Sequence, residues 1–120
     1  MDLRELNARV TSAIFRAEHL PPGSLEADLA FDEVSQVEAE IARRTTPDTV
    51  EGAIARRGAV TAARRAHDVL RALSLAETYL AEPAPAELGA ELRVLRDQAE
   101  AELSTRVANV RQVFFELHAA

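Results

Sequence analysis

The sequence predicts an all-α protein, arranged as an elongated bundle of four to five helices, and three observations support this fold class. Alanine is the most abundant residue, and alanine, leucine, arginine and glutamate are among the strongest helix formers. Aromatic residues make up only 4% of the chain, and β-branched residues are scarce, so a sheet has few suitable side chains. Apolar residues recur at steps of three and four, which is the period of a helix. The 120 residues suit one all-helical domain over residues 1–120.

The first predicted helix covers Met1–Leu20 and has one apolar face. Pro21-Pro22-Gly23 ends it, because proline lacks a backbone donor and glycine relaxes the turn. Phe15 lies nearly opposite the apolar face. That face consists of Leu3, Leu6, Val10, Ala13, Ala17 and Leu20.

The second predicted helix begins after Ser24, a favourable N-cap, and ends near Arg43 and Arg44, which suit the negative end of a helix dipole. Leu25 and Leu29 lie off its main stripe, so we expect its first turns to be covered on two faces. The stripe consists of Ala27, Ala30, Val34, Val37 and Ile41, with Phe31 at its edge.

The middle of the chain contains no helix breaker from Asp48 up to Pro83. Thr46 is the predicted N-cap, followed by Pro47 and Asp48 in the first turn. One helix of this length would measure roughly 54 Å, more than the roughly 35 Å diameter of a compact domain of this size. The apolar phase also shifts between Val50 and the later leucines. We therefore favour a break at His67–Asp68, giving two antiparallel helices, and keep one continuous helix as the alternative.

The last predicted helix, about Ala86–Leu117, follows Pro83-Ala84-Pro85 and has the most regular pattern. Its seam predicts a core contact along roughly 48 Å, which is long for a monomer of this size. Phe115 points away from this seam. The seam consists of Leu88, Leu92, Leu95, Ala99, Leu103, Val107, Val110, Phe114 and Leu117.

Residues 55–83 combine an acidic turn residue, a helix with small residues four apart, a tyrosine and a closing proline. These are Asp68, Ala72, Ala76, Tyr79 and Pro83. This order resembles one degenerate unit of the tetratricopeptide repeat family. Gly58 is similar to a glycine of the family's first helix, although it lies about two residues too far upstream, and the aromatic residue expected early in that helix is missing. The resemblance implies a helical-repeat-like hairpin and a scaffold that binds proteins without chemistry of its own.

Charge is unevenly distributed along this acidic chain, whose net charge is −6. Residues 43–71 carry seven arginines and three acids, whereas residues 1–42 and 72–120 have net charges of −6 and −4. Arg57, Arg64 and Arg71 are spaced by seven, so we expect them to share one helical face, which Arg44, Arg56 and Arg65 extend. Such a face suits a phosphate backbone or an acidic protein. The favoured interpretation is intramolecular: the basic middle packs between two acidic arms, with Asp68 paired to Arg64 and Arg71.

No catalytic, cofactor or metal motif is recognisable. The chain has no cysteine, and its three histidines, His19, His67 and His118, form no Glu-x-x-His or His-x-x-x-His pair. Its serines form no Gly-x-Ser-x-Gly motif and its glycines no phosphate loop. Most carboxylates, such as Asp32, Glu33, Glu38, Glu40, Glu100 and Glu102, are expected on polar faces. We therefore expect neither an enzyme nor a bound cofactor.

Two exposed aromatic residues complete the set of candidates. Phe15 and Phe115 lie off the apolar stripes of their helices, where each either contacts a partner or is covered by a neighbouring helix. The sequence predicts a non-catalytic helical interaction or assembly module that self-associates, most simply as a homodimer. A nucleic-acid-associated regulator or packaging factor using Arg57, Arg64 and Arg71 is the alternative, which the acidic net charge disfavours. No apolar run approaches the roughly 20 residues of a membrane span, and the mixed-charge N-terminus is unlike a signal peptide, so we expect a cytoplasmic protein.

Overall fold

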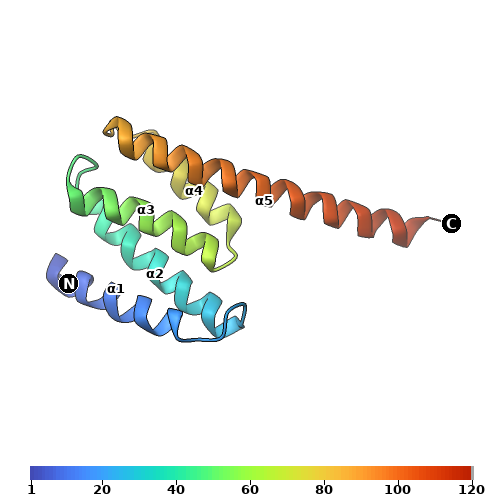
Figure 1. Cartoon of the computed structure of the whole chain (residues 1–120), viewed down its shortest axis with the longest axis horizontal. Coiled ribbons are helices and arrows are strands. Elements are labelled where there is room, and N and C mark those ends of the chain that lie inside the picture. Colours follow the sequence, from blue (N-terminus) through green and yellow to red (C-terminus); the bar gives the residue numbers. More distant parts are fainter. Residues whose placement is uncertain (120) are drawn as a thin grey trace.

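A computed structural model describes residues 1–119, and within them it confirms an all-α fold of five helices in an elongated bundle (Figure 1). The helices are α1 (Leu3–Glu18), α2 (Leu25–Arg43), α3 (Val50–Arg65), α4 (Val69–Leu80) and α5 (Ala86–His118). They alternate in direction, so each antiparallel neighbour is reached through a short connection. The molecule measures 60 × 33 × 19 Å along its principal axes.

Side-chain caps fix where four of the helices begin. The oxygens of Asp2, Ser24, Thr49 and Asp68 accept hydrogen bonds from backbone N–H groups three residues further on, at 2.8 to 3.1 Å. The predicted N-cap at Thr46 is therefore wrong by three residues. Residues 46–49 instead form a turn, in which the Thr46 carbonyl accepts from the backbone N–H of Thr49 at 3.2 Å. Gly52 packs against this turn, where a Cβ atom would overlap the Thr46 carbonyl.

The predicted break in the middle segment is confirmed. The chain leaves the helical conformation at His67, which has a φ of 62°, and Asp68 then caps α4. Because α3 and α4 are separate antiparallel helices, Val50 and the later leucines do not need to lie on the same face of one helix. The core face of α3 is instead made of small residues, and Val50 and Ile54 are exposed.

The helices pack in chain order, since each contacts the next and α5 also packs on α3. The main core is formed by two kinds of surface. The helices α1 and α2 and the first half of α5 contribute their predicted apolar stripes, and α3 and α4 contribute their alanine-rich faces. Small side chains allow this close approach: Ala59, Ala63, Ala72 and Ala76 are fully buried. The second covered face expected at the start of α2 is absent, because Leu25 and Leu29 are 70% and 63% exposed.

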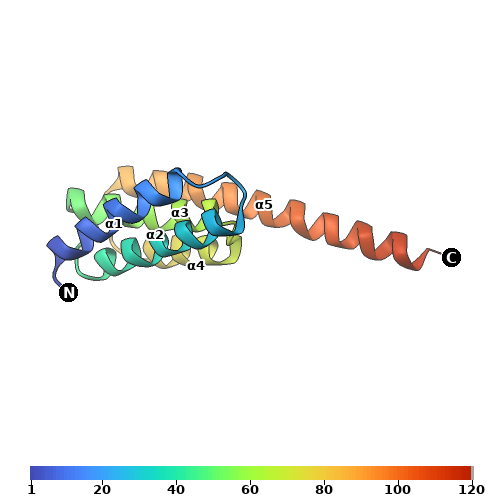
Figure 2. The same cartoon turned by 90° about the horizontal axis from the view of Figure 1, so that it is seen from below.

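The last helix extends far beyond the bundle (Figures 1 and 2). Its seam is buried at Leu88, Leu92 and Ala99 and partly buried at Leu103, but every described residue from Val107 onward is exposed. The chain itself therefore covers only the first half of the seam, in agreement with the prediction that the seam is too long for a monomer of this size. We call residues 107–118 the projecting segment.

Candidate interaction surfaces

The bundle neutralises most of its arginines internally. Arg57 pairs with Glu91 at 3.0 Å and Arg64 lies 3.8 Å from Glu102, so both meet α5. Arg71 turns the other way, toward α2, and its Nε donates to Ser35 at 3.0 Å. The three predicted site arginines therefore do not form one face, because the turn at His67 redirects the chain between Arg64 and Arg71.

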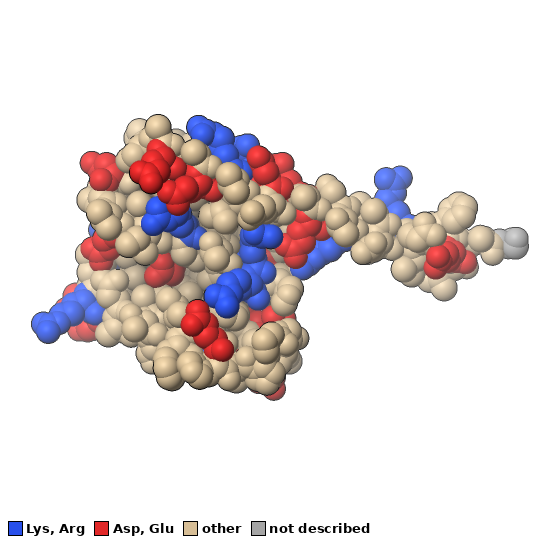
Figure 3. Space-filling model, in the orientation of Figure 1, with Lys and Arg blue, Asp and Glu red and all other residues tan. Residues whose placement is uncertain are grey.

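These contacts agree with the intramolecular interpretation of the charge pattern, since the basic middle meets acids from both flanking regions. Arg65 completes the pattern by reaching Glu18 of α1 at 3.5 Å. Figure 3 shows acidic and basic side chains interspersed over one face of the bundle. The expected pairs of Asp68 with Arg64 and Arg71 are replaced by a backbone contact, since the Asp68 carboxylate caps α4 through the Arg71 N–H.

Arg56 is a core residue rather than part of a surface patch. Its side chain is only 3% exposed and forms a two-point ion pair with Glu82, at 2.8 and 3.0 Å. It also donates to the backbone carbonyls of Ala42, Thr45 and Gly52, at 2.9 to 3.1 Å. The guanidinium thus fastens the turn between α2 and α3 to the end of α4.

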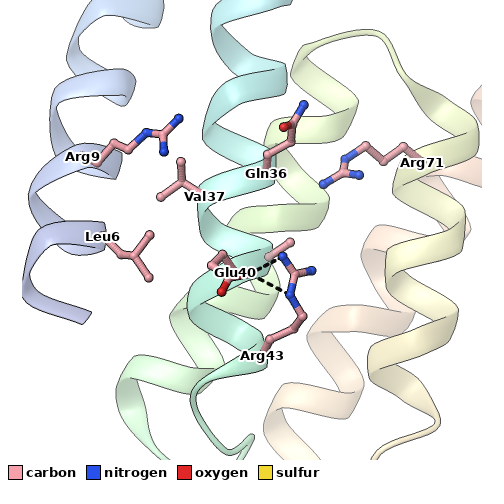
Figure 4. Close-up of a pocket in the computed structure, with 8 residues that line it drawn as sticks. Leu6, Arg9, Gln36, Val37, Glu40, Arg43 and Arg71 are labelled. Carbon is pink, nitrogen blue, oxygen red and sulfur yellow. Dashed lines mark hydrogen bonds and ion pairs between the residues drawn. The ribbon is translucent and has the colours of Figure 1, made fainter. Parts of the chain in front are cut away.

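A shallow hollow of about 380 Å³ lies across α2 between α1 and α4 (Figure 4). Arg9, Arg43 and Arg71 surround it, which gives it the composition of an anion site. Each of these arginines already has a partner, however: Glu33 for Arg9, Glu40 for Arg43 and Ser35 for Arg71. Arg71 is thus the one arginine of the hollow without an acidic partner among the described residues, and a single such cation beside two ion pairs is a weak basis for an anion site.

A second hollow, of about 330 Å³, lies where α1, α2 and α3 meet, and we call it the Glu38 groove. Its lining is mostly apolar and is supplied by Asn7, Glu38, Ile41, Val50, Glu51, Ile54 and Ala55. Glu38 is only 6% exposed, and no hydrogen bond or ion pair to its carboxyl is formed among the residues the structure describes. Burial raises the pKa of this carboxyl from 4.5 to about 7. The expectation that such carboxylates lie on polar faces is therefore wrong for Glu38.

Glycine in α3 makes room for this acid. A Cβ atom on Gly58 would overlap the Glu38 carboxyl group, so the acid rests against the bare backbone of α3. At the mouth of the groove, Asn7 donates to Glu51 at 2.7 Å and ties α1 to α3. The groove thus combines a buried, unpaired acid with aliphatic walls that reach the surface.

The projecting segment is the largest apolar feature outside the bundle. Six large apolar side chains are each between 47% and 76% exposed, namely Val107, Val110, Val113, Phe114, Phe115 and Leu117. Phe114 stacks on His118 with ring centroids 4.2 Å apart. Arg111 lies on the same side of the helix, three and four residues before the two phenylalanines. It forms no ion pair with any residue described.

Phe15 is exposed as well, at 66%, so a neighbouring helix does not cover it. It stacks on His19 with ring centroids 4.2 Å apart, and the Nδ1 atom of His19 lies 2.7 Å from the Phe15 carbonyl. Phe15 and Phe115 therefore lie on separate surfaces: Phe15 belongs to α1 of the bundle, and Phe115 to the projecting segment.

The described residues contain no cluster of three or more histidine, cysteine or acidic side chains arranged to hold a metal ion. Within the same part of the chain, no helix has both the length and the apolar character that crossing a membrane requires. Comparison with protein-family models, curated proteins and solved structures found no significant match. The resemblance of residues 55–83 to a tetratricopeptide repeat therefore stays a prediction.

Two buried charges were missed at the sequence level, although their spacing marks them. Glu38 follows Val34 by four residues and precedes Ile41 by three, which places it on the apolar stripe of α2. Arg56 lies between Gly52 and Ala59 on the small-residue face of α3. A charge within an apolar stripe is the pattern that identifies both residues.

Proposed function

We propose that this protein is a non-catalytic helical assembly module that self-associates as a homodimer through the projecting segment of α5. The observation that carries the proposal is the row of exposed apolar side chains on residues 107–118. The segment continues the 33-residue helix α5, so it holds these side chains in a helical arrangement that a partner can cover. A twofold dimer is the commonest closed assembly and covers the same surface on both copies.

Phe115 is the anchor of the proposed contact, together with Phe114 beside it. Aromatic side chains at the centre of an interface commonly cost about 2 kcal/mol or more when they are removed. Phe15 is proposed to serve a protein partner at the other surface. The cytoplasmic location and the absence of enzymatic activity stay predictions.

The alternative of a nucleic-acid contact has less support, because Arg57, Arg64 and Arg71 are each engaged by groups of the same chain. Phosphate binding would have to displace these partners. Such binding would also fall steeply with salt, so a salt titration of a DNA mobility shift distinguishes it from self-association.

The dimer is tested by light scattering at tens of micromolar protein. We expect a dimer for the natural sequence and a helical monomer for Phe115→Glu, which places a charge in the contact. Leu70→Glu is the matched control, because Leu70 is 65% exposed on α4 of the bundle. It should remain dimeric. A monomer for the natural sequence refutes the proposal, whereas unfolding of Phe115→Glu would place Phe115 in a structural role.

A further inference from the structure

The Glu38 groove and the projecting segment have complementary chemistry. The groove holds a buried acid without a partner among the described residues, between aliphatic walls. The projecting segment holds Arg111, a cation without a described ion-pair partner, between exposed apolar side chains. An arginine flanked by apolar groups matches an acid flanked by apolar groups, because one contact then buries apolar surface and pairs both charges.

The two surfaces of one copy do not meet. The groove lies at the end of the bundle where α1 and α3 begin, and the projecting segment leaves the opposite end (Figure 1). Since α5 is one continuous helix, the projecting segment does not fold back onto its own groove. A contact between these surfaces therefore requires two molecules.

We propose that the projecting segment of one copy docks in the Glu38 groove of a second copy, with Arg111 paired to Glu38 and with Phe114 and Val107 against Ile54 and Val50. This proposal rests on the self-association proposed above and names the surface that receives the segment. In a twofold pair with antiparallel bundles, each projecting segment runs along its partner toward the end that holds the groove. Both grooves are then filled by the same contact.

The distribution of side chains around the projecting segment suits this arrangement. Val107, Arg111 and Phe114 follow one another at steps of four and three, so they share one side of the helix, and Phe115 lies at the edge of that side, four residues after Arg111. Glu116 lies on the other side, where its carboxylate accepts from Gln112 at 3.0 Å. The segment therefore presents its only cation, and not its acid, to the groove.

Ionising the Glu38 carboxyl in this buried position costs free energy when no cation is nearby. Burial alone holds the pKa of Glu38 at about 7, with no charged neighbour compensating. A guanidinium that enters the groove offsets this cost by pairing with the carboxylate. Hydrogen bonds between two charged groups are stronger than those between neutral groups. The groove is thus better suited to an arginine-bearing segment than to a purely apolar one.

The decisive experiment mixes two variants that each damage one half of the contact. Ile54→Arg blocks the groove and leaves the segment intact, whereas Phe114→Glu damages the segment and leaves the groove intact. Each variant alone should be monomeric by light scattering. A mixture should form heterodimers in native mass spectrometry, because one intact segment can enter one intact groove. Val94→Arg is the matched control, since Val94 is 56% exposed on α5 outside the groove, and it should remain dimeric.

The outcomes separate the two proposals. A natural protein that is monomeric refutes both of them. A dimer that Ile54→Arg leaves as tight as before refutes only the groove and indicates pairing of α5 with α5. A mixture that contains no heterodimer also refutes the exchange.

A second set of variants decides the matter if Ile54→Arg fails to fold. Glu38→Gln and Arg111→Gln keep the shapes of the side chains and remove one charge each. Each should raise the dimer Kd about tenfold, and the double variant should be little weaker than either single one, as for directly coupled residues. Arg93→Gln, another arginine of α5 without a described ion pair, should leave the Kd unchanged. Effects of Glu38→Gln and Arg111→Gln that simply multiply would overturn the pairing.

Discussion

The two halves of α5 carry one unbroken apolar seam, yet they lie in opposite environments. From Leu88 to Ala99 the seam fills the core against α3 and α4, with Leu92 fully buried. From Val107 to Leu117 the same spacing continues in solvent. A helical pattern therefore specifies which face of a helix is apolar, but not what covers that face. In the first half the cover is the chain itself, and in the second half we propose that it is another copy.

The charged residues show a similar contrast within the bundle. Arg56 is buried with Glu82 and three backbone carbonyls around it, whereas Glu38 is buried with no partner. A buried cation whose partners are all present, as with Arg56 and the partly buried Glu82, is a closed structural contact. The acid without a partner is the one that we propose a second copy completes.

The largest expected effect concerns the closed contact. Glu82→Gln should destabilise the bundle by about 3–5 kcal/mol, because it leaves the Arg56 guanidinium buried without its counter-ion. Chemical denaturation measures this loss. Glu87→Gln, an exposed acid at the start of α5, is the matched control and should change the stability by less than about 0.5 kcal/mol. A loss below about 1 kcal/mol for Glu82→Gln would show that Arg56 does not depend on this pair.

The contrast along α5 is tested by the same substitution in each half. Leu92→Ala should cost about 2–5 kcal/mol of folding stability, because it leaves a cavity in the core. Leu117→Ala removes a side chain that is 76% exposed and should cost less than about 0.5 kcal/mol. Both melts are made in the Phe115→Glu background, where dimerisation does not contribute. Equal losses would mean that the projecting segment packs on its own bundle.

Much of the fold was predictable because the local rules are strong. The Ser24 cap, the proline boundaries and the break at His67–Asp68 all follow from backbone chemistry near the residues concerned. The predicted start of α3 at Thr46 lies three residues before the observed cap at Thr49, because a proline that suits the first turn of a helix also suits the second position of the turn over residues 46–49. In the observed turn Gly52 packs against the Thr46 carbonyl, a close approach that a residue with a Cβ atom would not allow.

The surfaces were harder to predict because they depend on which helices meet. The seven-residue spacing of Arg57, Arg64 and Arg71 indicates one face only if α3 and α4 are continuous, and the turn at His67 removes that condition. Val50 and Ile54 are the largest apolar residues at the start of α3, yet both are exposed, and a face of alanines and Arg56 is buried instead. Small side chains give a weak periodic pattern, so the sequence does not show clearly which face of α3 enters the core.

The smallest expected effect is a pH dependence that comes from the open groove. The pKa of Glu38 is about 7 in the folded protein and close to 4.5 in the unfolded chain, so the folded state holds this proton more tightly. Its favourable contribution is complete below pH 4.5 and is lost as the pH rises through 7. Glu51 of α3 is the other titratable group that lines the groove, and its contact with Asn7 of α1 is present in both variants compared.

The measurement compares Glu38→Gln with its parent, both in the monomeric Phe115→Glu background, by denaturation between pH 5 and 8.5. Relative to Glu38→Gln, the parent should lose roughly 1–2 kcal/mol across this range, a value reduced from the full shift because water reaches the groove mouth. Acids paired in the folded state, such as Glu40 with Arg43 and Arg44, change the stability of both proteins alike and cancel in the difference. A difference that is flat with pH would mean that Glu38 is ionised at no cost in the monomer. The groove would then need no cation from a second copy.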